Sequence, residues 1–219
     1  MKTLGVLGGM GPAATVAFLA RLQALTPATG DADHIRVLMD LNPHVPDRNT
    51  RPGEAEVELG AMARRLAAAG AEVLAMPCNT AHAQAVGIRA AGLPFIDMIA
   101  ATTAAAKATG AAAIGVLATG GGRALYAPAL TAAGLTPVLL AEADQARFMA
   151  LVYAVKAGDV GPERRAEMRA LGQALLAAGA GAVIAGCTEV PLLLDAGDLD
   201  APLVDSAEVL ARACVEMCR

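Results

Sequence analysis

Two cysteines have the sequence context of reactive thiols. Cys78 lies in the segment MPCNTAH and Cys187 in AGCTEVP, so each follows a short apolar run and precedes polar residues. A free thiol has a pKa of about 8.5, and a helix N-terminus lowers that value toward neutrality. One thiolate can then remove a proton from carbon while a second thiol delivers one. The pair therefore predicts acid–base chemistry by two cysteines.

Other roles for these cysteines stay open at this point. A cysteine taken alone is most often a small buried hydrophobic residue. A redox disulfide between Cys78 and Cys187 is a third interpretation, although neither lies in a C-x-x-C arrangement.

Short apolar runs alternate with longer helical patterns along the whole chain. The expected strands are 4–7, 35–41, 72–76, 94–96, 113–117, 137–140, 182–185 and 203–204. The expected helices are 13–25, 54–69, 81–91, 99–109, 123–133, 145–156, 163–178 and 207–218. Such alternation predicts an α/β fold with parallel sheets covered by helices on both faces.

An internal repeat divides the chain into two halves. The segment LGVLGGMG resembles IGVLATGG, GAEVLAMPCNT resembles GAGAVIAGCT, and LPFID resembles APLVD. The spacing is kept as well, since Gly5 precedes Cys78 by 73 residues and Gly115 precedes Cys187 by 72. The repeat predicts two pseudo-symmetric α/β domains, each a roughly four-stranded parallel sheet flanked by helices. Their expected extents are 1–97 plus 206–219 for the first and 98–205 for the second.

The repeat places both cysteines at equivalent sheet edges. Ligands of open parallel sheets bind at the carboxyl ends of the strands, where Cys78 and Cys187 are expected. If the halves face each other about a pseudo-twofold axis, the two sulfur atoms look across one interdomain cleft. That cleft is the expected active site.

Four motifs resemble the aspartate racemase branch of the Asp/Glu racemase family. They are LGGMGP, NPHVPDR, MPCNTAH and GCTEVP, and they occur in order along the whole chain. The resemblance implies a cofactor-independent racemase with two α/β domains, an interdomain active site and usually a homodimer. It also implies that Cys78 and Cys187 are the catalytic pair, one for each face of the substrate.

Polar residues beside the cysteines are candidates for substrate binding. Asn79, Thr80 and Thr188 can hold the α-carboxylate together with backbone N–H groups. Helix capping is an equally good role for these residue types. The two roles can coexist.

Two basic residues are candidates for binding an acidic side chain. Arg48 lies in a proline-rich loop, and its guanidinium can bind a carboxylate through two hydrogen bonds. A solvated surface arginine is the ordinary alternative, but the resemblance favours the ligand role. The resemblance also implies that Lys156, in the segment AVKAGD, approaches the substrate. Its alternative role is as a partner of the helix dipole.

A glycine-rich turn in each half completes the expected site. The turn at 8–11 lets backbone approach a small anion, with Met10 as the expected wall. Its repeat partner at 118–122 keeps Thr119, but glycines follow where relatives have further threonines. That difference puts substrate identity in question.

Four further residues have weaker assignments. His82, four residues after Cys78, can pair with that thiol on one helix face or serve in packing. Glu189 can tune the Cys187 thiol or cap the following turn. Cys214 and Cys218 are expected to pack in the core.

Composition excludes several classes of function. The net charge is −4 and only 2% of residues are aromatic, so the chain lacks the basic surface and stacking residues of a nucleic-acid-binding protein. The two long uncharged stretches are interrupted by glycine and rich in alanine, which argues against a membrane span. Four cysteines are too few for a disulfide framework. We therefore expect a soluble cytoplasmic protein with reduced thiols.

No metal and no cofactor is expected. Cys78 and His82 lack further metal ligands at suitable spacing. Nothing marks any of the three lysines as a pyridoxal-phosphate site.

These observations predict a racemase that interconverts L- and D-aspartate, with glutamate as the near alternative. The expected partner is a small acidic amino acid, and the expected assembly is a homodimer. Hydantoin racemisation and maleate isomerisation are alternatives on the same scaffold. A catalytically silent small-acid binding protein and a thiol-redox protein are alternatives from other classes.

Overall fold

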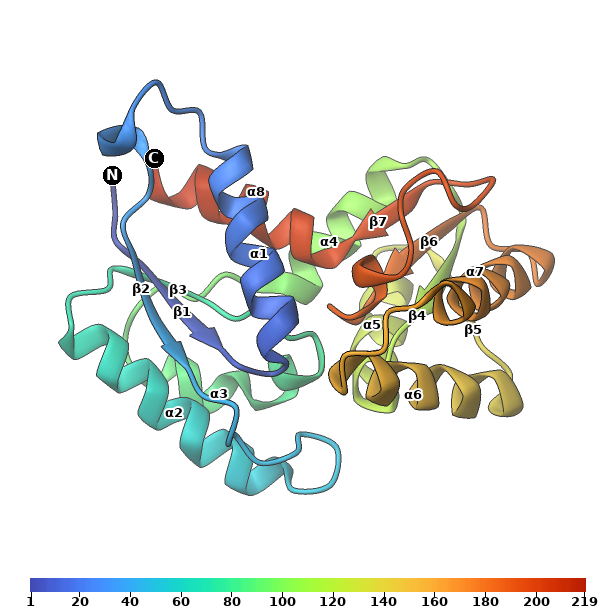
Figure 1. Cartoon of the computed structure of the whole chain (residues 1–219), viewed down its shortest axis with the longest axis horizontal. Helices are drawn as coiled ribbons and strands as arrows, with labels where there is room; N and C mark the ends of the chain where they lie inside the picture. The colour runs from blue at the N-terminus through green and yellow to red at the C-terminus, as the bar shows by residue number, and fades with distance from the viewer. The chain divides into compact units, whose positions relative to one another are not determined.

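The computed structural model describes residues 1–219, which form two units built on parallel sheets (Figure 1). Unit 1 comprises Met1–Met98 and Ala207–Arg219, and unit 2 comprises Ile99–Ser206. The chain therefore passes from unit 1 into unit 2 and returns for its last helix. The predicted α/β fold class is confirmed.

Unit 1 is centred on a three-stranded parallel sheet with the order β2-β1-β3. The strands are β1 (Leu4–Gly8), β2 (Val37–Leu41) and β3 (Val73–Ala75). The helices are α1 (Pro12–Leu25), α2 (Pro52–Ala68), α3 (Ala85–Arg89) and the returning α8 (Ser206–Cys218), with 3₁₀ turns at η1 (Asp31–Asp33) and η2 (Thr80–Gln84). Figure 1 shows α1 and α8 on one side of this sheet and α2 and α3 on the other.

The alternation of side chains along β1 explains this two-sided arrangement. Leu4 and Val6 pack in an apolar cluster with residues of α1 and α8, whereas Leu7 packs with residues of α2. All five residues of β1 are buried, as expected for a central strand of a parallel sheet. Gly5 is required there because a Cβ atom would lie 2.8 Å from the Cβ of Ala71.

Unit 2 is centred on a four-stranded parallel sheet with the order β5-β4-β6-β7. The strands are β4 (Ala113–Leu117), β5 (Thr136–Leu139), β6 (Ala182–Ala185) and β7 (Leu203–Asp205). The helices are α4 (Met98–Ala108), α5 (Gly120–Ala132), α6 (Glu142–Lys156) and α7 (Pro162–Ala177), followed by a 3₁₀ turn at η3 (Val190–Leu192). Gly115 of β4 meets Leu175 of α7, where an added Cβ would lie 3.0 Å from the leucine Cβ.

The two sheets repeat one register. Gly5 of β1 pairs with Leu74 of β3, four residues before Cys78. Gly115 of β4 pairs with Val183 of β6, four residues before Cys187. Each cysteine therefore lies the same number of residues after the residue that pairs with the glycine of the neighbouring strand.

Two elements differ from the sequence expectation. The strand expected at 94–96 is reduced to one parallel bridge between Phe95 and Leu74, because Pro94 has no N–H to extend the pairing and the Met98 N–H donates to His82 instead. Unit 1 therefore has three strands rather than four. The single helix expected at 81–91 is divided into η2 and α3, with non-helical backbone at Gln84. None of the helices combines the length and apolar character needed to cross a membrane.

Candidate functional site

Cys78 lies just beyond the carboxyl end of β3, as the sequence predicts. Its side chain is buried and belongs to an apolar cluster that also contains Met10 and Val45. Asn79 and Thr80, which follow it, are buried as well. Unit 1 thus brings the predicted residues Met10, Cys78, Asn79 and Thr80 to the same end of its sheet.

His82 fixes the backbone of the Cys78 loop rather than its thiol. Its Nδ1 lies 2.9 Å from the Cys78 carbonyl oxygen, and its Nε2 accepts a hydrogen bond from the Met98 N–H at 3.1 Å. Because Nε2 accepts, the donor is Nδ1 and the ring is neutral. Burial lowers the pKa of His82, although the hydrogen bond with the Cys78 carbonyl opposes this effect. The suggested pairing with the thiol is therefore wrong, and the ring instead packs against Phe95 with centroids 5.2 Å apart.

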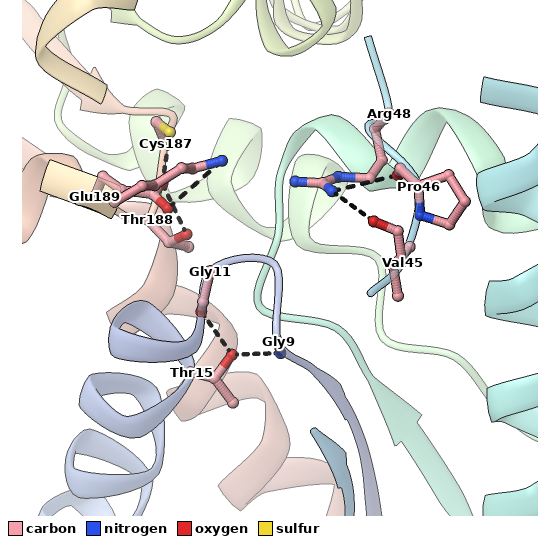
Figure 2. Close-up of polar contacts among 10 residues, drawn as sticks. Gly9, Gly11, Thr15, Val45, Pro46, Arg48, Cys187, Thr188 and Glu189 are labelled. Atoms are coloured by element: carbon pink, nitrogen blue, oxygen red, sulfur yellow. Dashed lines mark hydrogen bonds and ion pairs between the residues drawn. The ribbon is translucent and has the colours of Figure 1, made fainter. Parts of the chain in front are cut away.

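The glycine-rich turn after β1 is held by a threonine that the sequence analysis overlooked. The Thr15 hydroxyl accepts a hydrogen bond from the Gly9 N–H and donates one to the Gly11 carbonyl, both at 3.0 Å (Figure 2). Gly9 has a φ of +98°, and a Cβ there would lie 2.4 Å from the Asn42 backbone. The Gly9 N–H is thus engaged within the turn, which removes one of the donors expected to bind an anion. A threonine one helical turn after Gly11 is the signal that could have indicated this.

Arg48 lies in the loop after β2 with an incompletely paired guanidinium. Its terminal Nη1 donates to the carbonyl oxygens of Val45 at 3.4 Å and Pro46 at 3.3 Å (Figure 2). Its buried Nε has no hydrogen-bond partner. The neighbouring Asp47 is partly buried, which raises its pKa. Backbone hydrogen bonds from Asn49 and Thr50, together with the Arg48 charge, outweigh this effect and hold the pKa of Asp47 below its usual range. Arg48 is therefore a half-buried cation with donor capacity left over.

Cys187 lies beyond the carboxyl end of β6 and contacts a buried carboxylate. Its thiol donates to Glu189 Oε2 at a sulfur–oxygen distance of 2.9 Å, and the Thr188 hydroxyl donates to the same oxygen at 3.4 Å (Figure 2). The sequence suggestion that Glu189 tunes this thiol is thus confirmed as a direct contact. The Glu189 side chain is only 4% exposed.

The electrostatics of Cys187 differ from the sequence expectation. Burial raises the pKa of this thiol well above its usual range, and the charge and hydrogen bond of Glu189 raise it further, while Lys156 opposes the shift. The expected lowering by a helix N-terminus is wrong here, because only the three-residue turn η3 follows. Cys187 is therefore a protonated thiol at neutral pH.

Lys156, the last residue of α6, lies near the same carboxylate. Its Nζ is 4.0 Å from Glu189 Oε1, and its side chain is 31% exposed. Unit 2 thus brings together the predicted residues Lys156, Cys187 and Thr188.

Thr119 lies at the start of α5, where it caps the helix. Its hydroxyl accepts a hydrogen bond from the Gly122 N–H at 3.2 Å. The neighbouring turn is held by Gln145, which donates to the Ala118 carbonyl at 3.0 Å and accepts from Arg123 at 3.0 Å. These two polar residues were absent from the sequence expectation, because residues 22 to 27 positions apart give no local signal.

The remaining cysteines have the packing role that was expected. Cys214 and Cys218 are buried in the apolar cluster between β1 and α8. Burial raises the pKa of Cys214 strongly, which keeps this thiol protonated. No group of three or more histidine, cysteine, aspartate or glutamate residues is placed to hold a metal ion.

Fold and site together define a protein of two related parallel-sheet units with a cysteine at the same register position of each. The chain belongs to the Asp/Glu/hydantoin racemase family, whose family model matches residues 7–214. Membership supports an amino-acid racemase as the class of enzyme.

Individual relatives agree with this assignment. The chain is 30% identical to a glutamate racemase of Roseiflexus sp. over 76% of its own length and 63% of that protein, so it spans less than two thirds of this relative. It is 28% identical to the broad specificity amino-acid racemase RacX of Bacillus subtilis over 97% of its length and 96% of RacX. Among solved structures, Picrophilus torridus aspartate racemase is 27% identical with a TM-score of 0.89, covering 100% of this chain and 94% of that one.

Proposed function

We propose that this protein is an amino-acid racemase that interconverts L- and D-aspartate by a two-base mechanism, with glutamate as a second substrate. The observation that carries the proposal is the equivalent register of the two cysteines. Cys78 and Cys187 each lie four residues beyond the residue that pairs with the central glycine of their sheet. Two thiols in equivalent positions suit a racemisation, in which a proton leaves one face of the α-carbon and another is added to the opposite face.

The proposed reaction moves one proton on and one proton off the α-carbon. The thiolate of one cysteine takes the α-proton, so that a C–H bond breaks and an S–H bond forms. The thiol of the other cysteine gives its proton to the opposite face of the carbanion and becomes a thiolate. Each turnover therefore exchanges the protonation states of Cys78 and Cys187, and the reverse reaction starts from the exchanged form.

Binding groups are proposed for both ends of the substrate. Asn79, Thr80 and Thr188 are proposed to hold the α-carboxylate, whose charge must be balanced while the carbanion exists. Met10 and Thr119 are proposed to limit the space around it.

The acidic side chain is assigned to the two cations. Arg48 retains an unpaired Nε–H, which supports a role in binding a carboxylate. Lys156 is assigned to the same carboxylate because its partly exposed ammonium group has three donors and a single carboxylate neighbour at 4.0 Å. No cofactor is part of the proposed mechanism, and we further propose a cytoplasmic homodimer.

The test is α-proton exchange in D₂O under reducing conditions. Purified protein is incubated with L-aspartate without added cofactor, and NMR follows loss of the α-proton signal while chiral chromatography follows D-aspartate. We expect both to occur at matching rates. Absence of exchange with aspartate and with glutamate contradicts the proposal, and binding without exchange indicates a silent small-acid binding protein.

Variants connect the activity with the proposed residues. Cys78→Ala and Cys187→Ala are each expected to abolish racemisation, whereas Cys218→Ala, which removes a buried thiol outside the site, is expected to retain it. Arg48→Lys keeps the charge but loses the planar donor pair, so we expect a KM for aspartate raised about 10-fold or more, equivalent to about 1.4 kcal/mol of binding. An unchanged KM removes Arg48 from substrate recognition.

A further inference from the structure

Glu189 is a buried carboxylate with an unusual set of neighbours. Its Oε2 accepts from the Cys187 thiol at 2.9 Å and from the Thr188 hydroxyl at 3.4 Å. Its Oε1 is buried and has no hydrogen-bond partner. The Lys156 ammonium lies 4.0 Å from Oε1. A carboxylate removed from water normally has its acceptor positions filled, so this one is held for a purpose other than fold stability.

The direction of the contact with Cys187 shows what the carboxylate does. A thiolate cannot donate a hydrogen bond, so the contact exists only while the sulfur carries its proton. Loss of that proton would place two negative charges about 3 Å apart in a site with little water. The carboxylate therefore favours the thiol over the thiolate and sets where the S–H bond points.

We propose that Glu189 is a positioning residue that keeps Cys187 in the thiol form, with Lys156 as the neighbouring cation, so that Cys187 starts as the proton donor. The donor step rests on the racemase function proposed above, whereas the effect of Glu189 on the thiol does not. In the resting enzyme Cys78 is then the cysteine that removes the α-proton. When Cys187 becomes a thiolate at the end of a turnover, Lys156 is the cation placed to reduce the repulsion.

Alkylation of Cys187 measures its thiolate fraction directly. Wild-type protein is treated with iodoacetamide at pH 7.5, and peptide mass spectrometry follows modification of each cysteine over time. In Glu189→Gln the negative charge is removed with little change in shape. If the pKa of the thiol falls by one unit, the thiolate fraction rises about tenfold. The alkylation rate rises only about threefold, because a less basic thiolate is a weaker nucleophile. We expect Cys187 to be alkylated about three- to tenfold faster, with Cys78 unchanged.

Two companion variants separate charge from structure. Glu189→Asp keeps the charge and is expected to alkylate within about twofold of wild type, even though its side chain is shorter. Lys156→Met removes the cation and is expected to slow Cys187 alkylation, which is opposite in sign to Glu189→Gln. Glu163→Gln makes the same charge change on an exposed residue of α7 and serves as the matched control. If Glu189 had only a structural role, Glu189→Gln and Lys156→Met would not change the Cys187 alkylation rate in opposite directions. Glu189→Asp would also not keep the wild-type rate.

The outcomes separate this proposal from the racemase proposal. Unchanged or slower alkylation in folded Glu189→Gln overturns the positioning role, and slower alkylation identifies Glu189 as a base that takes the thiol's proton. If alkylation changes as expected but wild-type protein exchanges no α-proton, the effect of Glu189 on Cys187 is supported and only the racemase function fails. Circular dichroism of each variant establishes that it is folded.

Discussion

Replacement of His82 by leucine removes the side chain that connects two buried backbone groups. The imidazole pairs with the Cys78 carbonyl at 2.9 Å and with the Met98 N–H at 3.1 Å, and the residue is 7% exposed. Leucine fills a similar volume but pairs with neither group. Leaving a buried polar group without a partner costs about 1–3 kcal/mol. We therefore expect His82→Leu to reduce the free energy of unfolding by about 2–6 kcal/mol, since two groups lose their partner.

The same residue should make wild-type stability dependent on pH. Burial lowers the pKa of His82 in the folded chain, so between that value and the unfolded value of about 6.5 only the unfolded state binds the proton. The stabilisation is fully present above pH 6.5 and is lost as the pH falls below it. For one such group the loss between pH 7.5 and pH 5.5 is at most about 1.4 kcal/mol.

Urea unfolding followed by circular dichroism at pH 7.5 and 5.5 measures both effects. Wild-type protein should lose stability on acidification, and His82→Leu should be less stable at pH 7.5 but lose less between the two values. His44→Gln, at an exposed histidine, should follow wild type. An identical pH dependence in wild type and His82→Leu would refute the reasoning.

Two further predictions concern packing and the glycine-rich turn. Gly115→Ala should lower the free energy of unfolding by about 1–3 kcal/mol, because the new methyl group meets the Leu175 side chain of α7 3.0 Å away. Gly120→Ala, with nothing within 4 Å, should be neutral or slightly stabilising. Thermal unfolding compares the two variants. Thr15→Val keeps the shape of the side chain but leaves the Gly9 N–H without its acceptor. We expect the free energy of unfolding to fall by about 1–3 kcal/mol and the Gly9 amide to exchange faster, as measured by NMR. Exchange as slow as in wild type would contradict the role of this hydroxyl.

Much of the fold follows from patterns that the sequence displays openly. The runs at Ala113–Leu117 and Ala182–Ala185 are strands with the expected bounds, because each is apolar throughout and is followed by glycine or a small residue. The internal repeat could also be recognised in the sequence, since the two sheets have glycine and cysteine at equivalent positions. The strand expected around Phe95 failed because the Met98 N–H that would extend its pairing donates to His82, a contact that local composition does not encode.

The candidate site was predictable in its residue types and not in its contacts. The carboxylate at Glu189 stands two positions after Cys187, so the sequence could suggest an interaction with the thiol. The sequence could not show that the Cys187 side chain is buried, and burial is the main reason why the pKa of this thiol is raised, with the charge of Glu189 adding to it. Likewise His82 at the fourth position after Cys78 was a fair candidate partner, but the path of the chain presents a backbone carbonyl to the ring instead of a sulfur atom.

The return of the last helix to unit 1 affects the order in which the protein can fold during synthesis. Unit 2 is one uninterrupted segment, whereas unit 1 receives Ala207–Arg219 only after all of unit 2 has been made. Until then Leu4, Val6 and Phe18 lack the α8 side chains, among them Leu210 and Cys214, that share their cluster. Because domains fold as units while the ribosome works, the second unit is complete first. The side of the unit 1 sheet that α1 covers is therefore translated early yet reaches its final packing last.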